Sequence, residues 1–315
     1  MLHNHLHNHK DFVDLLRIVG QEKSIDPTLV EKDYWIMHCL FGLQQLGLKF
    51  QLKGGTSLSK GFGIIERFSE DIDIMIEPLK TMQVKTKTND DKESDRKSRK
   101  QYYDWLAKNI IIAGIKEIER DHMFDDVPKY RSGGIRLYYN SCMPSMAGIK
   151  DGILLEVGFD DITPNEPITI SSWAYDYAKS KLGLIDNRAI EVPCYHYGYT
   201  LVEKLQTIST KFRKQQKEGS FPANFMRHYY DVYCLLQEPK VQAFIGTTEY
   251  KEHKEKRFRS SDNPIISENE AFLLNDKATR KIYVDAYQGK SKIYYSEQPK
   301  FEDIIELIQK YTPLL

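Results

Sequence analysis

Two short stretches decide the fold, KGGTSLSK at residues 53–60 and RFSEDIDI at residues 67–74. The first begins at the end of a short run, residues 49–53, that predicts a strand, and its two glycines precede residues typical of a helix start. The second belongs to another predicted strand, residues 69–77, which ends before a proline. A strand, a glycine turn, a helix start and a second strand in succession indicate an α/β unit.

The second strand carries two carboxylates. Because side chains alternate along a strand, Asp71 and Asp73 lie side by side on one face, while Ile72 and Ile74 face the other. Like charges this close repel each other unless a cation lies between them. Mg²⁺ fits because it prefers oxygen ligands and is held by one or two carboxylates plus substrate phosphates, and Mn²⁺ is an alternative. Taken alone, the pair also fits an exposed edge strand with two solvated acids.

The glycine turn predicts a phosphate site. Gly54 and Gly55 let backbone amides approach a ligand, and Thr56 and Ser57 place hydroxyls at a helix start, where free N–H groups attract phosphate. We include Lys60, the cation that ends the stretch, in this predicted site. The Gly-Lys-Ser/Thr order of a P-loop is absent from the sequence, which argues against an ordinary ATPase or GTPase.

Apolar spacing elsewhere predicts the remaining elements. Residues 11–47 have helical periodicity interrupted near Asp26, which predicts a helical hairpin. Downstream we expect a solvated charged segment at 80–100, a helix at 101–119, strands at 134–139 and 152–159, and helices at 199–214, 224–236 and 302–311. The predicted fold is α/β, with a small mixed sheet flanked by helices over residues 1–195 and a mainly helical lobe over residues 196–315.

The composition excludes several classes of protein. Lysine plus arginine and aspartate plus glutamate both total 45, so a nucleic-acid contact would need a local basic patch. The four cysteines are far apart and form no CxxC pair, which argues against a zinc knuckle and a disulfide scaffold. No apolar stretch approaches a membrane span, and the N-terminus lacks the apolar core of a signal peptide. We therefore expect a cytoplasmic protein with no membrane segment.

The N-terminus is rich in histidine, with His3, His5, His7 and His9 in its first nine residues. Imidazole is a common metal ligand. A terminal segment is expected to be flexible, however, and therefore to offer no fixed ligand geometry.

Several blocks taken together resemble the AbiEii/AbiGii toxin family of the polymerase-beta-like nucleotidyltransferase superfamily. They are EKDYW at 31–35, the two stretches quoted above, TLVEKL at 200–205 and RHYYDVYCLL at 227–236. The resemblance spans most of the first 236 residues, and the joint occurrence of the blocks is more specific than any one of them.

The resemblance implies roles for the residues of the first lobe. In the superfamily the paired aspartates bind magnesium, which bridges the triphosphate of the incoming nucleotide, and the motif match gives that role to Asp71 and Asp73. Ser57 and the amides around Gly55 would contact the terminal phosphates. The third carboxylate of the superfamily corresponds to Glu156, as metal ligand or general base, although many members have aspartate there.

In the second lobe the resemblance points to Lys204 and Asp231. The ammonium of Lys204, the motif lysine, suits phosphate charge that grows in the transition state. Asp231 is the motif aspartate, four residues after Arg227 and on the same helical face, so a plain Arg–Asp helix pair is the structural alternative. Family members often carry an aspartate where this chain has His228.

The resemblance implies a metal-dependent enzyme that transfers a nucleoside monophosphate from an NTP to an acceptor hydroxyl. It further implies the toxin of a bacterial toxin–antitoxin or phage-defence pair, with a separately encoded, DNA-binding antitoxin and tRNA as acceptor, although fold does not fix substrate. Two alternatives stay open. The enzyme could modify a small molecule or a protein side chain, or the chain could be a non-catalytic nucleotide-binding module.

Overall fold

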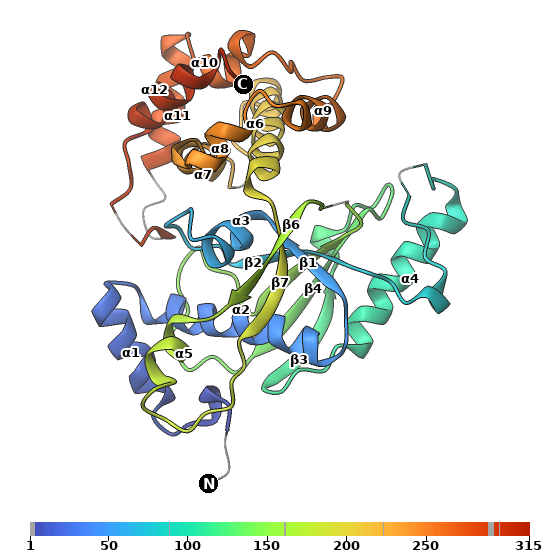
Figure 1. Ribbon diagram of the computed structural model, residues 1–315, viewed down its shortest axis with the longest axis vertical. Helices are drawn as coiled ribbons and strands as arrows, with labels where there is room; N and C mark the ends of the chain where they lie inside the picture. The colour runs from blue at the N-terminus through green and yellow to red at the C-terminus, as the bar shows by residue number, and fades with distance from the viewer. Residues whose placement is uncertain (1–3, 88, 161, 223, 289–292, 296) are drawn as a thin grey trace. The chain divides into compact units, whose positions relative to one another are not determined.

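The computed structural model describes residues 4–87, 89–160, 162–222, 224–288, 293–295 and 297–315 (Figure 1). The chain forms two compact units. Unit 1 comprises Met1–Phe62 and Phe68–Tyr195, and unit 2 comprises Gly63–Arg67 and His196–Leu315. None of the helices in the described part of the chain combines the length and apolarity needed to cross a bilayer.

Unit 1 is built on one mixed sheet, which has seven strands within the described residues and the order β3-β4-β5-β2-β1-β7-β6 (Figure 1). Strand β2 runs parallel to β5 and antiparallel to β1, and β1 runs parallel to β7. This sheet confirms the predicted α/β fold class. The strands are β1 (Phe50–Lys53), β2 (Asp71–Ile76), β3 (Ile115–Asp121), β4 (Ser132–Tyr139), β5 (Ile153–Gly158), β6 (Asn165–Ile170) and β7 (Ala189–Tyr195).

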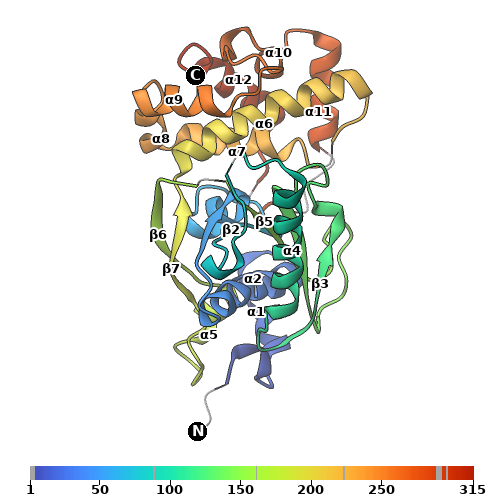
Figure 2. The same cartoon turned by 90° about the vertical axis from the view of Figure 1, so that its right-hand side faces the viewer.

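The predicted helical hairpin forms α1 (Phe12–Lys23) and α2 (Pro27–Gln45). Helix α2 begins where predicted because the Asp26 side chain accepts a hydrogen bond from the Thr28 N–H and proline occupies the first turn. Helix α5 (Trp173–Ala178) packs beside both helices (Figures 1 and 2). The isoleucines of β2 and their neighbours on β5 are fully buried on the face opposite the aspartates, which supplies the apolar core.

Unit 2 is helical, as predicted, and α7, α8, α9 and α10 pack against the long helix α6 (Figure 2). Tyr229 lies edge-on to Tyr283 and Phe301 at the centre of this unit, with ring centroids 6.1 and 5.4 Å apart. The helices are α6 (Tyr197–Glu218), α7 (Arg227–Gln237), α8 (Pro239–Phe244), α9 (Thr248–Arg257), α10 (Glu270–Leu273), α11 (Lys277–Gln288) and α12 (Phe301–Tyr311).

The helix predicted at 101–119 is wrong at both ends. Helix α4 spans Glu93–Asn109, and β3 follows after a turn at Gly114, whose φ is +80°. Three consecutive isoleucines after Asn109 favour extended backbone, and the left-handed glycine stops any continuation of the helix. Strands β6 and β7 were not predicted. Each contains a proline, a residue that weakens the strand signal, and Pro167 and Pro193 lie directly opposite each other in the ladder.

The charged segment at 80–100 is less solvated than predicted. Arg99 is fully buried, and its guanidinium donates hydrogen bonds to the carbonyls of Lys85, Asp90 and Lys129 at 2.7–2.9 Å. These bonds fasten the loop before α4 to the loop before β4.

The expectation of a flexible histidine-rich terminus is also wrong for the part that the structure describes. The ring centroids of His5 and His7 lie 4.9 and 4.8 Å from that of His38 on α2. His7 Nδ1 is 2.8 Å from the hydroxyl of Tyr34. His3 lies outside the described residues.

Candidate active site

The predicted carboxylates share one face of the sheet in unit 1. Asp73 of β2 lies directly opposite Lys53 on β1 and Glu156 on β5, so the three residues form a row across adjacent strands. Asp71 stands two residues before Asp73 and therefore on the same face. The parallel register of β2 and β5 thus places Glu156 next to the aspartate pair. Lys53 also reaches Asp160, with its Nζ 2.8 Å from Oδ2.

The glycine turn fits around the carboxylate of Asp73. Gly54 has φ +74°, and a β-carbon built on it would lie 2.9 Å from Asp73 Cγ. A side chain at this position would be strained and would also collide with Asp73. The turn and the carboxylate strand are therefore parts of one packed unit.

The hydroxyls of the turn point inward. The Thr56 hydroxyl donates a hydrogen bond to the Asp71 carbonyl, and both Thr56 and Ser57 are fully buried. The Ser57 hydroxyl lies beside the thiol of Cys194, a weak hydrogen-bonding group whose pKa burial raises to about 12. Helix α3 (Gly54–Thr56) continues into a π-helical segment, Ser57–Gly61, that packs against β7. A ligand at this turn would thus meet backbone amides first.

Lys60 is engaged within unit 1. Its ammonium lies 2.5 Å from Oδ1 of Asp33 and 5.4 Å from the ring centroid of Trp173. The second carboxylate oxygen of Asp33 accepts a hydrogen bond from the Trp173 N–H at 2.8 Å. This buried pair fastens the glycine turn to α2 and α5, and the phosphate-binding role of Lys60 stays a prediction.

Asp71 has a cationic neighbour that sequence reasoning did not identify. Lys150 Nζ lies 3.3 and 3.2 Å from the two carboxylate oxygens of Asp71. The backbone N–H of Lys150 donates to Glu70 at 3.0 Å, and buried Lys32 donates to the Lys150 carbonyl. Lys150 precedes β5, so only the pairing of β5 with β2 reveals that it reaches Asp71.

The carboxylates suit a hard divalent cation. Both oxygens of Asp71 already face a positive charge, and carboxylate oxygens are the ligands that magnesium prefers. Within the described ranges, no three His, Cys, Asp or Glu side chains are grouped to hold a metal ion. The fit is therefore to a cation held by one or two carboxylates and completed by water and substrate phosphates.

In unit 2 the predicted lysine and aspartate form a buried ion cluster with an arginine. Asp231 accepts hydrogen bonds from Arg67 Nε at 2.6 Å and Nη2 at 2.7 Å, and Lys204 Nζ lies 2.8 Å from Asp231 Oδ2. Arg67 and Asp231 are 1% and 0% exposed. Burial alone would raise the pKa of Asp231, but the charges of Arg67 and Lys204 hold that pKa well below its ordinary value.

The cluster differs from the helix pair that spacing alone suggested. Arg67, from a different segment, and Lys204, from a different helix, both bond to the Asp231 carboxylate. The family resemblance implies no role for Arg67, the first residue of RFSEDIDI. The signal that could have found it is an arginine among apolar residues, which needs a buried carboxylate partner.

Sequence comparison agrees with the geometry. No curated protein of similar sequence was found. Residues 35–306 match a family described as nucleotidyl transferase AbiEii toxin, type IV toxin–antitoxin system. The match spans most of the chain and includes the carboxylate row, the glycine turn and the ion cluster of unit 2. The chain therefore belongs to the AbiEii family of nucleotidyl transferase toxins.

Proposed function

We propose that this nucleotidyltransferase moves a nucleoside monophosphate from an NTP to an acceptor hydroxyl and uses a divalent cation held by Asp71 and Asp73. The observation that carries the proposal is the register of β1, β2 and β5, because it puts Asp71, Asp73 and Glu156 on one face. When bound, magnesium would polarise the phosphoryl group and offset its negative charge.

Other residues of unit 1 have two further roles in this proposal, proton acceptance and orientation of the phosphates. We assign to Glu156, which lies next to Asp73, the role of accepting the proton of the attacking hydroxyl, either directly or through water. The backbone amides of Gly54 and Gly55 orient the phosphates, since the hydroxyls of Thr56 and Ser57 face inward. Gly54 keeps this turn close to Asp73.

In unit 2, Lys204 supplies a cation for phosphate charge. Asp231 bonds to both Lys204 and Arg67, so it fixes the direction of the ammonium. The Lys204 side chain is largely buried, with 11% of its surface exposed, and a phosphate would contact it through this exposed part. We assign Lys204 to phosphate contact and Asp231 to positioning Lys204.

The family implies a separate antitoxin and an NTP substrate. We propose that the antitoxin is a DNA-binding protein, that the pair acts in the cytoplasm in phage defence, and that the acceptor is the 3′ end of tRNA. The chain has no net charge, so an RNA acceptor would rely on a local basic surface. A small molecule or a protein side chain is the alternative acceptor.

One labelling experiment tests the proposal. The purified protein is incubated with Mg²⁺, each labelled NTP in turn, and either total tRNA or a protein extract, with Asp71→Asn run in parallel. Asp14→Asn, on the exposed face of α1, is the matched control. Label in tRNA that is lost only in Asp71→Asn supports the proposal. Label in protein would show that the acceptor is a protein side chain and not tRNA. The absence of label with every NTP would refute nucleotidyl transfer.

A further inference from the structure

Lys150 places a positive charge where a metal ion would have to bind. Its Nζ is almost equidistant from the two oxygens of Asp71, at 3.3 and 3.2 Å. The Asp71 side chain is 10% exposed, so little water competes for these oxygens. Lys150 therefore balances the charge of Asp71 within the protein itself.

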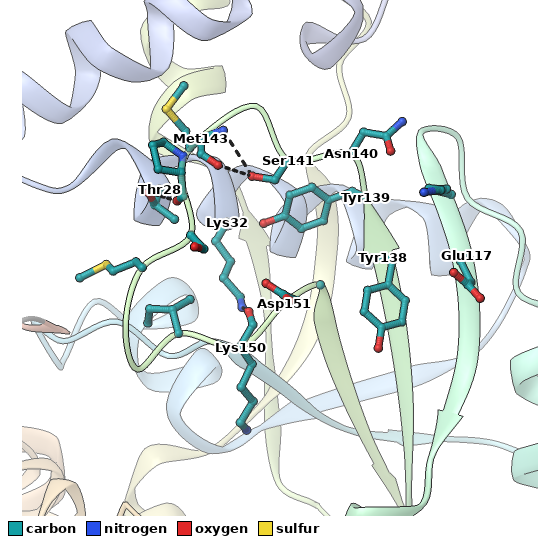
Figure 3. A pocket seen from close by; sticks show the side chains of 16 residues that line it. Thr28, Lys32, Glu117, Tyr138, Tyr139, Asn140, Ser141, Met143, Lys150 and Asp151 are labelled. Carbon is teal, nitrogen blue, oxygen red and sulfur yellow. Dashed lines mark hydrogen bonds between the residues drawn. The ribbon is translucent and has the colours of Figure 1, made fainter.

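The backbone of Lys150 is held from several sides. Its N–H donates to Glu70 Oε2, and its carbonyl accepts from Lys32, which also lies 3.5 Å from the same Glu70 oxygen. The next carbonyl, that of Asp151, accepts from Arg136 at 2.9 Å. Figure 3 shows Lys32 reaching toward Lys150. Burying the charges of Lys32 and Glu70 costs solvation free energy, so the pair adds little net stability. Its effect is to fix the position of residue 150, because both side chains bond to the Lys150 backbone.

The ammonium of Lys150 also contacts an aromatic ring. The centroid of Phe124 lies 4.6 Å from Lys150 Nζ, a favourable distance for a cation–π contact. Gly134 lets Phe124 and the Asp121 carbonyl approach β4, because a β-carbon there would collide with that carbonyl and lie 2.9 Å from Phe124 Cβ. The ammonium is thus directed by Asp71 on one side and by Phe124 on another.

The side chain nevertheless has room to move. The Lys150 side chain is 32% exposed, far more than its partner Asp71. Beside it opens a cavity of about 330 Å³, whose lining includes Lys32, Tyr139, Ser141 and Lys150 (Figure 3). The main chain of Lys150 is therefore anchored while its ammonium can swing.

A divalent cation and this ammonium cannot share the Asp71 oxygens. Magnesium coordinates oxygen at about 2.0–2.1 Å, which would bring it close to the ammonium and produce strong repulsion. Triphosphate oxygens, in contrast, attract an ammonium. We propose that Lys150 is a nucleotide-positioning residue that occupies Asp71 in the resting protein, leaves it when the divalent cation arrives, and then binds the triphosphate. This inference rests on the proposed function.

The test measures binding, not turnover. Mn²⁺ binding without nucleotide is followed by electron paramagnetic resonance, and binding of inorganic tripolyphosphate at saturating Mn²⁺ is followed by calorimetry. Lys150→Met is expected to bind Mn²⁺ about tenfold more tightly, because a competing charge is gone, and tripolyphosphate about tenfold more weakly. Lys150→Arg keeps the charge and is expected to stay closer to wild type on both measures.

Lys116→Met is the matched control, since it removes one charge from the exposed rim of the same cavity. Both of its affinities are expected to stay within about twofold of wild type, as for a screened surface charge. Unchanged or weaker Mn²⁺ binding in Lys150→Met overturns the displacement, and unchanged tripolyphosphate binding overturns the nucleotide contact. If wild-type protein binds no Mn²⁺ at all, the metal-dependent reaction itself fails, which is a different outcome.

Discussion

The carboxylate of Asp73 occupies the space that a β-carbon on Gly54 would need. Asp73 Cγ and Cβ lie 2.9 and 3.1 Å from that position, and the φ of Gly54 is +74°. The glycine is therefore required twice, once for its backbone conformation and once for the carboxylate packed against it. This contact joins the glycine turn to the strand that carries the two aspartates.

Gly54→Ala is expected to damage both stability and activity. The free energy of unfolding should fall by about 2–3 kcal/mol, as strain at a left-handed position adds to a clash with Asp73. Nucleotidyl transfer should fall at least about 100-fold, because small shifts of catalytic groups are costly. Gly47→Ala is the control: its φ is +70° and nothing lies within 4 Å of a β-carbon there, so it should lose only about 1 kcal/mol. Equal losses in the two variants would show that Asp73 does not restrict Gly54.

Glu156 gives a second test of the carboxylate row. Glu156→Gln should reduce nucleotidyl transfer about 100- to 10,000-fold, the range for a lost general base, while the denaturant midpoint changes little. Glu156→Asp should recover part of the rate, since many superfamily members have aspartate there. Glu117→Gln, exposed on the edge strand β3, should behave as wild type. A Glu156→Gln enzyme with full activity would leave Asp71 and Asp73 without the proposed third carboxylate.

Much of the site could be predicted because it depends on local rules. Alternation alone put Asp71 and Asp73 on one face, and the adjacent glycines marked a turn. Lys150 could not be found in this way, because its contact with Asp71 depends on which strand pairs with β2. A related reason applies to strands β6 and β7: each contains a proline, which weakens the local strand signal, and their pairing with each other and of β7 with β1 is non-local.

Lys204 and Asp231 should separate catalytic from structural effects. Lys204→Met leaves Asp231 with its two bonds to Arg67, so the free energy of unfolding should fall by only about 1 kcal/mol. Nucleotidyl transfer should fall strongly, because the cation for phosphate charge is lost. Asp231→Asn leaves two cations together, one of them fully buried, and should cost about 3–5 kcal/mol. Urea unfolding and labelling assays on both variants measure the difference. If Lys204→Met proves as unstable as Asp231→Asn, Lys204 is a structural residue.

The cluster formed by His5, His7 and His38 of α2 predicts how stability depends on pH. Burial lowers the pKa of His38 to about 4, from an ordinary value of 6.5, and His38 is 1% exposed. Its Nε2 lies 2.8 Å from the Ala113 carbonyl, and its Nδ1 lies 2.8 Å from the Asn187 amide. Both partners suit a neutral ring that donates from one nitrogen and accepts at the other. His7, whose ring lies edge-on to that of His38, has its pKa lowered to about 3, again mainly by burial.

Folded protein should therefore lose stability as the pH falls below 6.5. In that range the unfolded chain takes up a proton that folded His38 does not, so each pH unit costs up to about 1.4 kcal/mol until the pH approaches 4. Between pH 7 and pH 5 the free energy of unfolding should drop roughly 1–2 kcal/mol more in wild type than in His38→Gln. Urea titrations at both pH values, followed by tryptophan fluorescence, measure this, because Trp35 lies against His38 with centroids 5.6 Å apart. His122→Gln removes an imidazole from an exposed position and serves as control.

Since His38 packs against His5 and His7, the acid-sensitive step should also release the N-terminal segment, which hydrogen exchange of residues 5–9 would detect. Identical pH dependence in wild type and His38→Gln would mean that folded His38 takes up a proton as readily as the unfolded chain does.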